Sequence, residues 1–310
     1  GSQAIYKRDC VCGIFDCDSG DITSTCVISS RKQLPGHLCL DGRELGALVL
    51  TAGGSIECSP SFPSCRVDIA MRSIHVAGTL EASQVQLRAN VKMEVSGVIS
   101  ATGPLETYNS DCTDLWPPWG SSVSSSYRGY RMCSGAGGGH SALGGNAGAY
   151  ATSSSYTVPR LGSSRPLNIE AVVQPSIMGG SGGRGAYWDG YRYLWTDGGT
   201  GGGRIQIFTS SLMLTGRIAA DGKQPSSSSC SSTYACTSSA CRGDSTTASK
   251  CDACHCGGGG AGGSISIEAQ NLQGELGGRI SCNGADAKGH GGAGAGGKIA
   301  LRYEFISDSL

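Results

Sequence analysis

The sequence predicts an all-β protein built as a solenoid of stacked coils, in which neighbouring strands run parallel. The main observation is a repeated pattern of two glycine turns around one short strand. It occurs at residues 97–103, 216–222 and 278–284. In each copy an isoleucine is followed two places on by a small residue, as in a strand with one buried face. Repetition of such a unit is typical of a solenoid, so we expect Ile99, Ile218 and Ile280 to point inward and to be aligned.

A second strand of alternating apolar and polar residues accompanies these repeats. Such strands are expected at 74–76, 85–87, 91–95, 205–207, 265–267 and 298–301, and three of them follow glycine runs at 201–203, 257–263 and 289–297. Ile265 to Ile299 makes one coil of roughly thirty residues. The step from Ile205 to Ile265 is nearly twice as long, because a cysteine-rich insertion lies inside it. No stretch keeps the spacing of an amphipathic helix for more than about two turns, so no helix is expected.

Composition narrows the class of protein. The 310 residues include 24 basic and 24 acidic side chains, so no charge excess favours nucleic acid or an anionic membrane as a partner. The 51 glycines fall in clusters between strands and not in a Gly-X-Y period, which excludes collagen. No apolar run is long enough to cross a bilayer, and we expect no membrane insertion of this segment. Gly1-Ser2 has the appearance of a cloning remnant on an excised ectodomain.

Sixteen cysteines indicate an oxidising compartment, and we expect an extracellular protein with all or nearly all of them in disulfides. They are Cys10, Cys12, Cys17, Cys26, Cys39, Cys58, Cys65, Cys112, Cys133, Cys230, Cys236, Cys241, Cys251, Cys254, Cys256 and Cys282. The six between 230 and 256 are expected to bridge mostly among themselves, although spacing alone leaves the connectivity open. The alternative for residues 251–256, Cys-Asp-Ala-Cys-His-Cys, is a zinc site. We expect no metal and no cofactor.

The glycine-rich segments at 133–140 and 179–185, together with the coils from Gly201 onward, resemble uncharacterised extracellular glycine-rich proteins of plants and protists. The resemblance covers about residues 50 to 305 and carries no catalytic residues. It implies a right-handed parallel β-helix of the pectin-lyase-like kind. The clustering of seven cysteines between residues 10 and 65 separately predicts a cysteine-rich cap over 1–50, and the repeats predict a glycine-rich β-helix over 51–310. Insertions are expected near 104–134, 149–178, 186–198 and 223–256.

The glycine runs have two interpretations. Because coils repeat at the strand spacing, glycine runs at matched corners could pack closely as a structural ridge. Alternatively, their backbone amides could form an anion-binding nest, but no phosphate-loop signature is present.

All four tryptophans fall in the insertions, where binding chemistry is expected. The candidate ligand-binding residues are Trp116, Trp119, Tyr187, Trp188, Asp189, Tyr191, Arg192, Tyr193, Trp195 and Asp197. Aromatic faces with neighbouring Asp and Arg suit sugar rings, which stack on the faces and form hydrogen bonds at their edges. The alternative is that these aromatic side chains only cover the glycine ridge.

Three other features carry weaker hypotheses. His140, His255 and His290 lie in or beside glycine runs and could form a metal or acid/base site, or could simply cap loop carbonyls. Arg242-Gly243-Asp244 matches an integrin-recognition tripeptide, a pattern short enough to arise by chance. Asp189 and Asp197 share an aromatic setting suited to glycosidic chemistry, which needs two carboxyl groups about 5 to 10 Å apart.

The function that the sequence favours is non-catalytic recognition or adhesion at a cell surface or in a matrix. The expected partner is a glycan or an extracellular protein. The alternatives are an enzyme acting on polysaccharide, suggested only by analogy with other β-helices, and a self-associating structural subunit of a matrix or appendage.

Overall fold

The structure is a computed structural model that describes most of the repeat region and less of the insertions. The described residues are 11–12, 16–103, 137–140, 144, 175, 177–183, 185–188, 193–225, 257–274, 277–286 and 292–308. Their regular structure consists of strands alone, and no helix that could span a bilayer is found among them. The predicted all-β class is confirmed for these residues.

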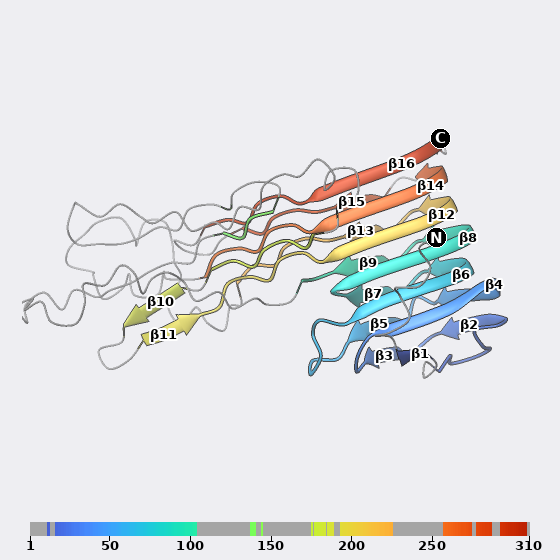
Figure 1. The fold of residues 1–310 in the computed structure, drawn as a ribbon, viewed down its shortest axis with the longest axis horizontal. Coiled ribbons are helices and arrows are strands. Elements are labelled where there is room, and N and C mark those ends of the chain that lie inside the picture. The colour runs from blue at the N-terminus through green and yellow to red at the C-terminus, as the bar shows by residue number, and fades with distance from the viewer. Residues whose placement is uncertain are drawn as a thin grey trace, which may run out of the picture.

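Most strands belong to two parallel sheets, which lie one behind the other (Figure 1). The long-strand sheet has the order β1-β4-β6-β8-β12-β14-β16, with β2 also paired to β4. Its strands are β1 (Val11–Cys12), β2 (Thr25–Ile28), β4 (Leu38–Leu50), β6 (Arg66–Val76), β8 (Gln84–Val95), β12 (Arg204–Leu214), β14 (Ser264–Gly274) and β16 (Lys298–Asp308). The short-strand sheet has the order β15-β13-β9-β7-β5-β3. Its strands are β3 (Arg31–Leu34), β5 (Ser55–Cys58), β7 (Thr79–Ala82), β9 (Val98–Ala101), β13 (Arg217–Ala219) and β15 (Arg279–Ser281).

From β3 to β9, and again from β12 to β16, the chain alternates between the two sheets, one strand in each. Parallel neighbours require such crossovers, because a tight hairpin can join only antiparallel strands. β2, β3 and β4 already follow this scheme, so the parallel sheets begin before residue 50.

The repeats are aligned residue for residue. Ile218 lies opposite Ile99 on β9 and opposite Ile280 on β15, as predicted. Ile99 and Ile218 are fully buried, and Ile280 packs partly buried against the same core. In the long-strand sheet, Ile265 lies opposite Ile205 on one side and Ile299 on the other, so these predicted strands are parallel neighbours in register.

The glycine-rich segments form a third body, the glycine bundle, which extends the strands of both sheets in one direction (Figure 1). It consists of residues 137–140, 177–183, 197–203, 220–225, 257–263, 282–286 and 292–297. Segment 257–263 lies at its centre and shows a period of three residues. Gly258 and Ala261 donate backbone hydrogen bonds to 180–183, Gly259 and Gly262 to 292–295, and Gly260 and Gly263 to 220–223.

Three further segments donate to the carbonyl groups of this central segment, through Gly138, Gly199, Gly202 and Ala285. The central segment therefore has six neighbours. Three residues per turn without internal hydrogen bonds is the geometry of a polyproline-II-type helix, and none of the described bundle glycines has a positive φ.

Glycine is required in the bundle because the segments approach one another closely: a Cβ on Gly260 would lie 2.0 Å from the carbonyl oxygen of Thr200. The structural interpretation of the glycine runs is supported. The hypothesis of an anion-binding nest is wrong for this segment, because every amide from Gly258 to Gly263 already donates to a backbone carbonyl.

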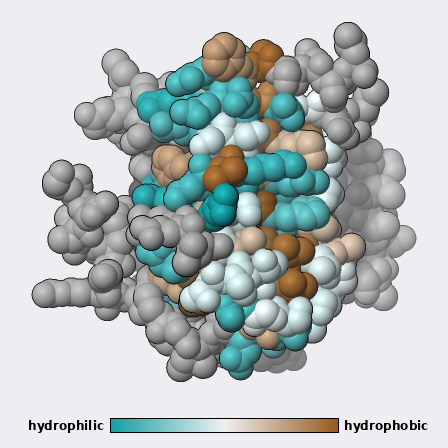
Figure 2. Space-filling model, turned by 90° about the vertical axis from the view of Figure 1, so that its right-hand side faces the viewer, coloured by the Kyte–Doolittle hydropathy of each residue, from teal (hydrophilic) through white to brown (hydrophobic). Residues whose placement is uncertain are grey.

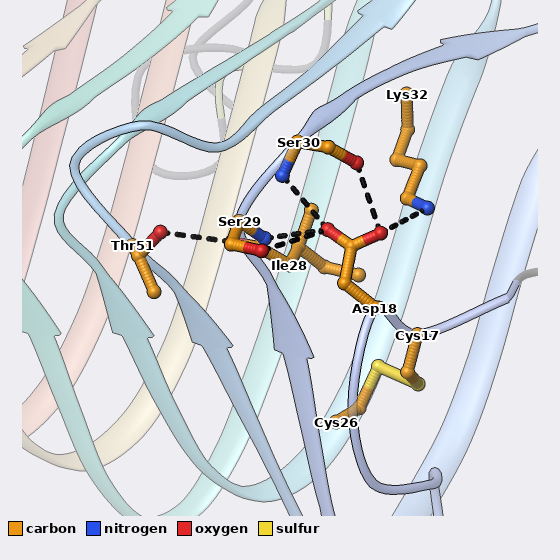
Figure 3. A network of polar contacts seen from close by, with 8 residues as sticks. All are labelled: Cys17, Asp18, Cys26, Ile28, Ser29, Ser30, Lys32 and Thr51. Carbon is orange, nitrogen blue, oxygen red and sulfur yellow. Dashed lines mark hydrogen bonds and ion pairs between the residues drawn. A yellow bond between two sulfur atoms is a disulfide. The ribbon is translucent and has the colours of Figure 1, made fainter.

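The N-terminal end of the sheets is fixed by covalent and polar contacts. Disulfides join Cys17 to Cys26 and Cys58 to Cys65, and Cys39 is also disulfide-bonded. Beside the first disulfide, the Asp18 carboxylate accepts hydrogen bonds from the amides of Ser29 and Ser30, both at 2.7 Å, and from Lys32 Nζ at 2.6 Å (Figure 3). The turn that leads from β2 into β3 is thereby held in place.

The prediction of a disulfide at Cys282 is wrong. This cysteine is a free thiol, 8% exposed, that follows β15 into the core. Its Sγ lies 3.6 Å from the carbonyl oxygen of Lys298, so it serves as a small buried side chain. The side chain of Cys12, and the residues Cys10, Cys112, Cys133, Cys230, Cys236, Cys241, Cys251, Cys254 and Cys256, lie outside what the structure describes.

Candidate functional site

A groove crosses the outer face of the long-strand sheet at the middle of four neighbouring strands. It has a volume of about 570 Å³. Its walls come from three consecutive residues of each strand: 88–90 of β8, 208–210 of β12, 268–270 of β14 and 302–304 of β16. No motif pointed to this surface, and we call it the mid-strand groove.

The groove lies where the alternation of buried residues changes phase. In β12 the buried positions are Ile205 and Ile207, and then Leu212 and Leu214. The pairing of β12 with β8 shifts register between Thr209 and Leu212, as at a β-bulge. Bulges bend a strand and redirect its side chains, and they are enriched beside functional sites. Here Ser210 Oγ donates to the carbonyl oxygen of Asn90 at 2.7 Å and satisfies a backbone group at the irregularity.

One row of side chains runs along the groove, with one residue on each strand. The register places Arg88 opposite Phe208, Phe208 opposite Glu268, and Glu268 opposite Arg302. Strands lie about 4.8 Å apart, so the row spans about 14 Å. This length suits a linear ligand that lies across the strands.

Contacts along the row hold its members in place. The Arg88 guanidinium lies 5.2 Å from the centre of the Phe208 ring, within the range of a cation–π interaction. Gln86, with its amide oxygen turned toward Arg88, accepts from Nε at 3.2 Å and from Nη2 at 3.0 Å. Arg302 Nη1 lies 4.0 Å from Glu268 Oε2, and both of these side chains remain about half exposed. The row is therefore ordered at the Arg88 end and accessible at the Arg302 end.

The groove is lined by groups that can form hydrogen bonds with a ligand. Two arginines and two glutamates balance in charge, which disfavours a strongly anionic ligand. Hydroxyl, amide, guanidinium and carboxylate groups next to aromatic rings can donate to and accept from a polyhydroxylated ligand.

The predicted aromatic loop proves to be a hairpin. β10 (Gly185–Trp188) pairs antiparallel with β11 (Tyr193–Thr196), with Trp188 opposite Tyr193 and Ala186 opposite Trp195. Cross-strand partners share a face and residues two apart return to it, so positions 186, 188, 193 and 195 belong to one face of the hairpin. Tyr187, opposite Leu194, belongs to the other face.

The glycine bundle positions this hairpin. Segments 177–183 and 197–203 flank it and are joined by hydrogen bonds from Gly182 to Gly199 and from Gly179 to Gly202, both at 2.9 Å. The hairpin lies beyond the glycine segments, on the side away from both sheets (Figure 1). Asp197 is half-buried at the start of the second flanking segment. Trp116, Trp119, Asp189, Tyr191 and Arg192 lie outside the described residues, as do the 104–134 insertion and most of the 149–178 and 223–256 insertions.

Of the three histidines, only His140 falls within the described residues. It is buried in the bundle, with Nε2 at 3.0 Å from the carbonyl oxygen of Ile177 and at 3.2 Å from Ser264 Oγ. These contacts favour the carbonyl-capping interpretation over a ligand role. His255, His290, the Arg242-Gly243-Asp244 tripeptide and the suggested zinc ligands at 251–256 lie outside the described residues.

Sequence reasoning missed the mid-strand groove, although a signal was present. Once Ile205, Ile265 and Ile299 are aligned as equivalent positions, counting three residues forward gives Phe208, Glu268 and Arg302. The polar and aromatic character of these outward positions was available from the repeat alone.

Comparison with known proteins adds no relative from which a function could be transferred. No protein-family model matches the chain, and neither a curated protein nor a solved structure is significantly similar to it. The functional argument therefore rests on the groove, the hairpin and the bundle.

Proposed function

We propose that this protein is an extracellular, non-catalytic recognition module that binds glycan on a right-handed parallel β-helix. The fold is supported by the alternation of the chain between two parallel sheets and by the residue-for-residue alignment of successive coils. Crossovers between parallel strands are right-handed in nearly all proteins. The resemblance to extracellular glycine-rich proteins of plants and protists points the same way.

An extracellular location is supported by the disulfides Cys17–Cys26 and Cys58–Cys65 and by the bonded state of Cys39. Disulfides persist in oxidising compartments and are rare in the cytosol. Glycans of cell surfaces and matrices are abundant ligands in that setting.

The observation that carries the proposal is the row Arg88, Phe208, Glu268 and Arg302 in the mid-strand groove. It offers charged and aromatic groups at regular intervals along about 14 Å. A linear oligosaccharide can use such a row, because its hydroxyl groups and apolar ring faces also repeat along the chain. The balanced charge favours a neutral or weakly charged oligosaccharide.

The hairpin β10–β11 is the second candidate for glycan contact, because its register places positions 188, 193 and 195 on one face. The two surfaces make different predictions. A groove binds the length of a polymer, whereas a short hairpin suits a terminal sugar.

An array of neutral and acidic oligosaccharides, followed by calorimetric titration of the best binder, tests the proposal. The Arg88→Ala variant is expected to weaken binding about tenfold or more, since a hydrogen bond to a charged group contributes about 1.5 to 3 kcal/mol. Lys92→Ala is the matched control, because Lys92 lies on the same strand outside the groove and pairs with Glu94 at 3.1 Å. It should bind as the wild type does.

Three results would redirect the proposal. Loss of binding only in Trp188→Ala or Trp195→Ala moves the site to the hairpin. Turnover of the bound oligosaccharide establishes the enzyme alternative. A failure of every oligosaccharide to bind overturns the glycan proposal.

A further inference from the structure

β16 is the outermost described strand of the long-strand sheet and carries most of the large hydrophobic side chains that are exposed in the described part of the chain. Among the described residues, six large hydrophobic side chains are exposed, and five of them lie on β16. They are Ile299 (45%), Leu301 (41%), Tyr303 (48%), Phe305 (67%) and Ile306 (58%). Apolar residues are visible at the upper edge of the molecule in Figure 2, the edge at which β16 lies in Figure 1. Patches of this kind mark interaction surfaces.

Among the described residues, the core is only partly covered at this edge. Ile299 and Leu301 lie opposite Ile265 and Ile267, which are 0% and 1% exposed. The last inward-facing residues of the sheet, on β16, are therefore only half covered. In the described part of the chain, no strand pairs with the far side of β16. An edge of 11 residues with open backbone donors and acceptors is a template for pairing with another strand.

The opposite edge of the sheet is protected. Its outer strands, β1 and β2, have two and four residues, and the Cys17–Cys26 disulfide fixes the turn that precedes β2. Short edge strands are a known protection against pairing between molecules. Head-to-tail stacking of copies would set the 11 residues of β16 against these short strands, so a chain of copies is disfavoured.

Charge is distributed along β16 so that an antiparallel partner fits. Its first five residues contain Lys298 and Arg302, and its last five contain Glu304 and Asp308. When two copies of β16 pair antiparallel about a two-fold axis, the basic half of each strand faces the acidic half of the other. Opposite charges across an antiparallel pair are stabilising, and a two-fold interface uses the same patch on both copies.

We propose that two copies of this chain associate tail to tail through β16, as a two-fold symmetric, antiparallel continuation of the long-strand sheet. The pairing covers the half-exposed side chains of Ile299 and Leu301 and gives hydrogen-bond partners to the open backbone groups of both β16 strands. It also brings together the two mid-strand grooves, because residues 302–304 of each copy lie at the junction. This last consequence rests on the proposed function, since it implies a ligand long enough to cross the two-fold axis.

Sedimentation analysis of the 310-residue chain without glycan tests the association directly. The wild type is expected at twice its monomer mass of 31.5 kDa. An acidic variant, Lys298→Glu with Arg302→Glu, and a basic variant, Glu304→Lys with Asp308→Lys, should each be monomeric, because like charges then face each other. An equimolar mixture of the two should restore the dimer, which a folding defect would not allow. Lys92→Glu, a charge change away from β16, should leave the dimer intact.

Each other outcome overturns the association. A monomeric wild type at micromolar concentration shows that β16 has a different partner or none. Growth into long assemblies indicates head-to-tail stacking, and dimers of both charge variants place the interface elsewhere. Because mass is measured without glycan, failure of the dimer and failure of glycan binding are recognised separately.

Discussion

Ile218 lies directly opposite Ile280 in the pairing of β13 with β15, and opposite Ile99 in the pairing with β9, although the three residues come from distant parts of the chain. The alignment survives the long insertion that precedes β14. The isoleucine of each glycine-bounded repeat therefore occupies the same position in successive strands of the short-strand sheet, and one column of the core depends on it.

Replacement of Ile218 by Ala should lower the free energy of unfolding by about 2 to 5 kcal/mol, because the fully buried side chain leaves a cavity between its two neighbours. Ile218→Asp would place an unpaired charge in the core and should prevent folding. Urea unfolding followed by circular dichroism measures both effects. Val91→Ala is the control, since Val91 is 51% exposed, lies away from β16 and should cost much less. An equal loss of unfolding free energy in both Ala variants would contradict the conclusion that Ile218 is part of a continuous buried column.

The close packing of the glycine bundle predicts which glycines can be replaced. The deciding factor is the room for a side chain, and not the backbone flexibility of glycine. A Cβ on Gly260 would lie 2.0 Å from the Thr200 carbonyl oxygen, whereas a Cβ on Gly296 would have no atom within 4 Å. Gly260→Ala should therefore destabilise the protein by about 3 kcal/mol or more, because rigid backbone on the neighbouring segment must move. Gly296→Ala should be neutral or slightly stabilising. Thermal unfolding of the two variants side by side would reveal whether the central segment is as tightly surrounded as its hydrogen bonds indicate.

The sequence was sufficient to predict the columns of the core but not the bundle. Ile99, Ile218 and Ile280 stand out because glycine turns bound each strand and an alternating pattern marks the inward residue. Inside a run such as 257–263, nearly every residue is glycine, so the three-residue period leaves no trace in the side chains. The six neighbours of that segment depend on backbone hydrogen bonds, which the sequence does not record.

Two other features were missed for different physical reasons. The mid-strand groove arises from a change of phase inside long strands, and the predicted strands were too short to contain it. The aromatic segment was interpreted as a loop, although Asp189-Gly190 between two β-prone stretches is a turn signal typical of a hairpin. The disulfide assigned to Cys282 was wrong because an even number of cysteines does not identify a single buried thiol.

The hydrogen bonds to the Asp18 carboxylate lead us to predict that the protein loses stability in acid. The ammonium of Lys32 and the backbone and hydroxyl donors of Ser29 and Ser30 hold the pKa of Asp18 well below its ordinary value of 3.8. A carboxyl with a lowered folded-state pKa stabilises the fold above its unfolded pKa, and this contribution is lost as the pH falls toward the folded-state value. Stability should therefore decline below about pH 4.

The Asp18→Asn variant should be less stable than the wild type at pH 7 and should converge with it in strong acid. Urea midpoints at a series of pH values for both proteins give the comparison. Curves that stay parallel over the whole range would show that this cluster (Figure 3) does not contribute to the acid dependence.

Cys282 should resist modification in the native protein. Burial, aided by the nearby Asp221 carboxylate, raises the pKa of its thiol to about 12, and only the thiolate is a good nucleophile. Iodoacetamide at pH 8 should leave Cys282 unlabelled in the folded chain and should label it after unfolding in guanidinium without reductant. Peptide mass spectrometry measures the extent of labelling. Cys17, Cys26, Cys58 and Cys65 serve as internal controls, because their disulfides should protect them in both states until a reductant is added. Rapid labelling of Cys282 in the native chain, or its recovery in a disulfide-linked peptide, would contradict the buried thiol between β15 and β16.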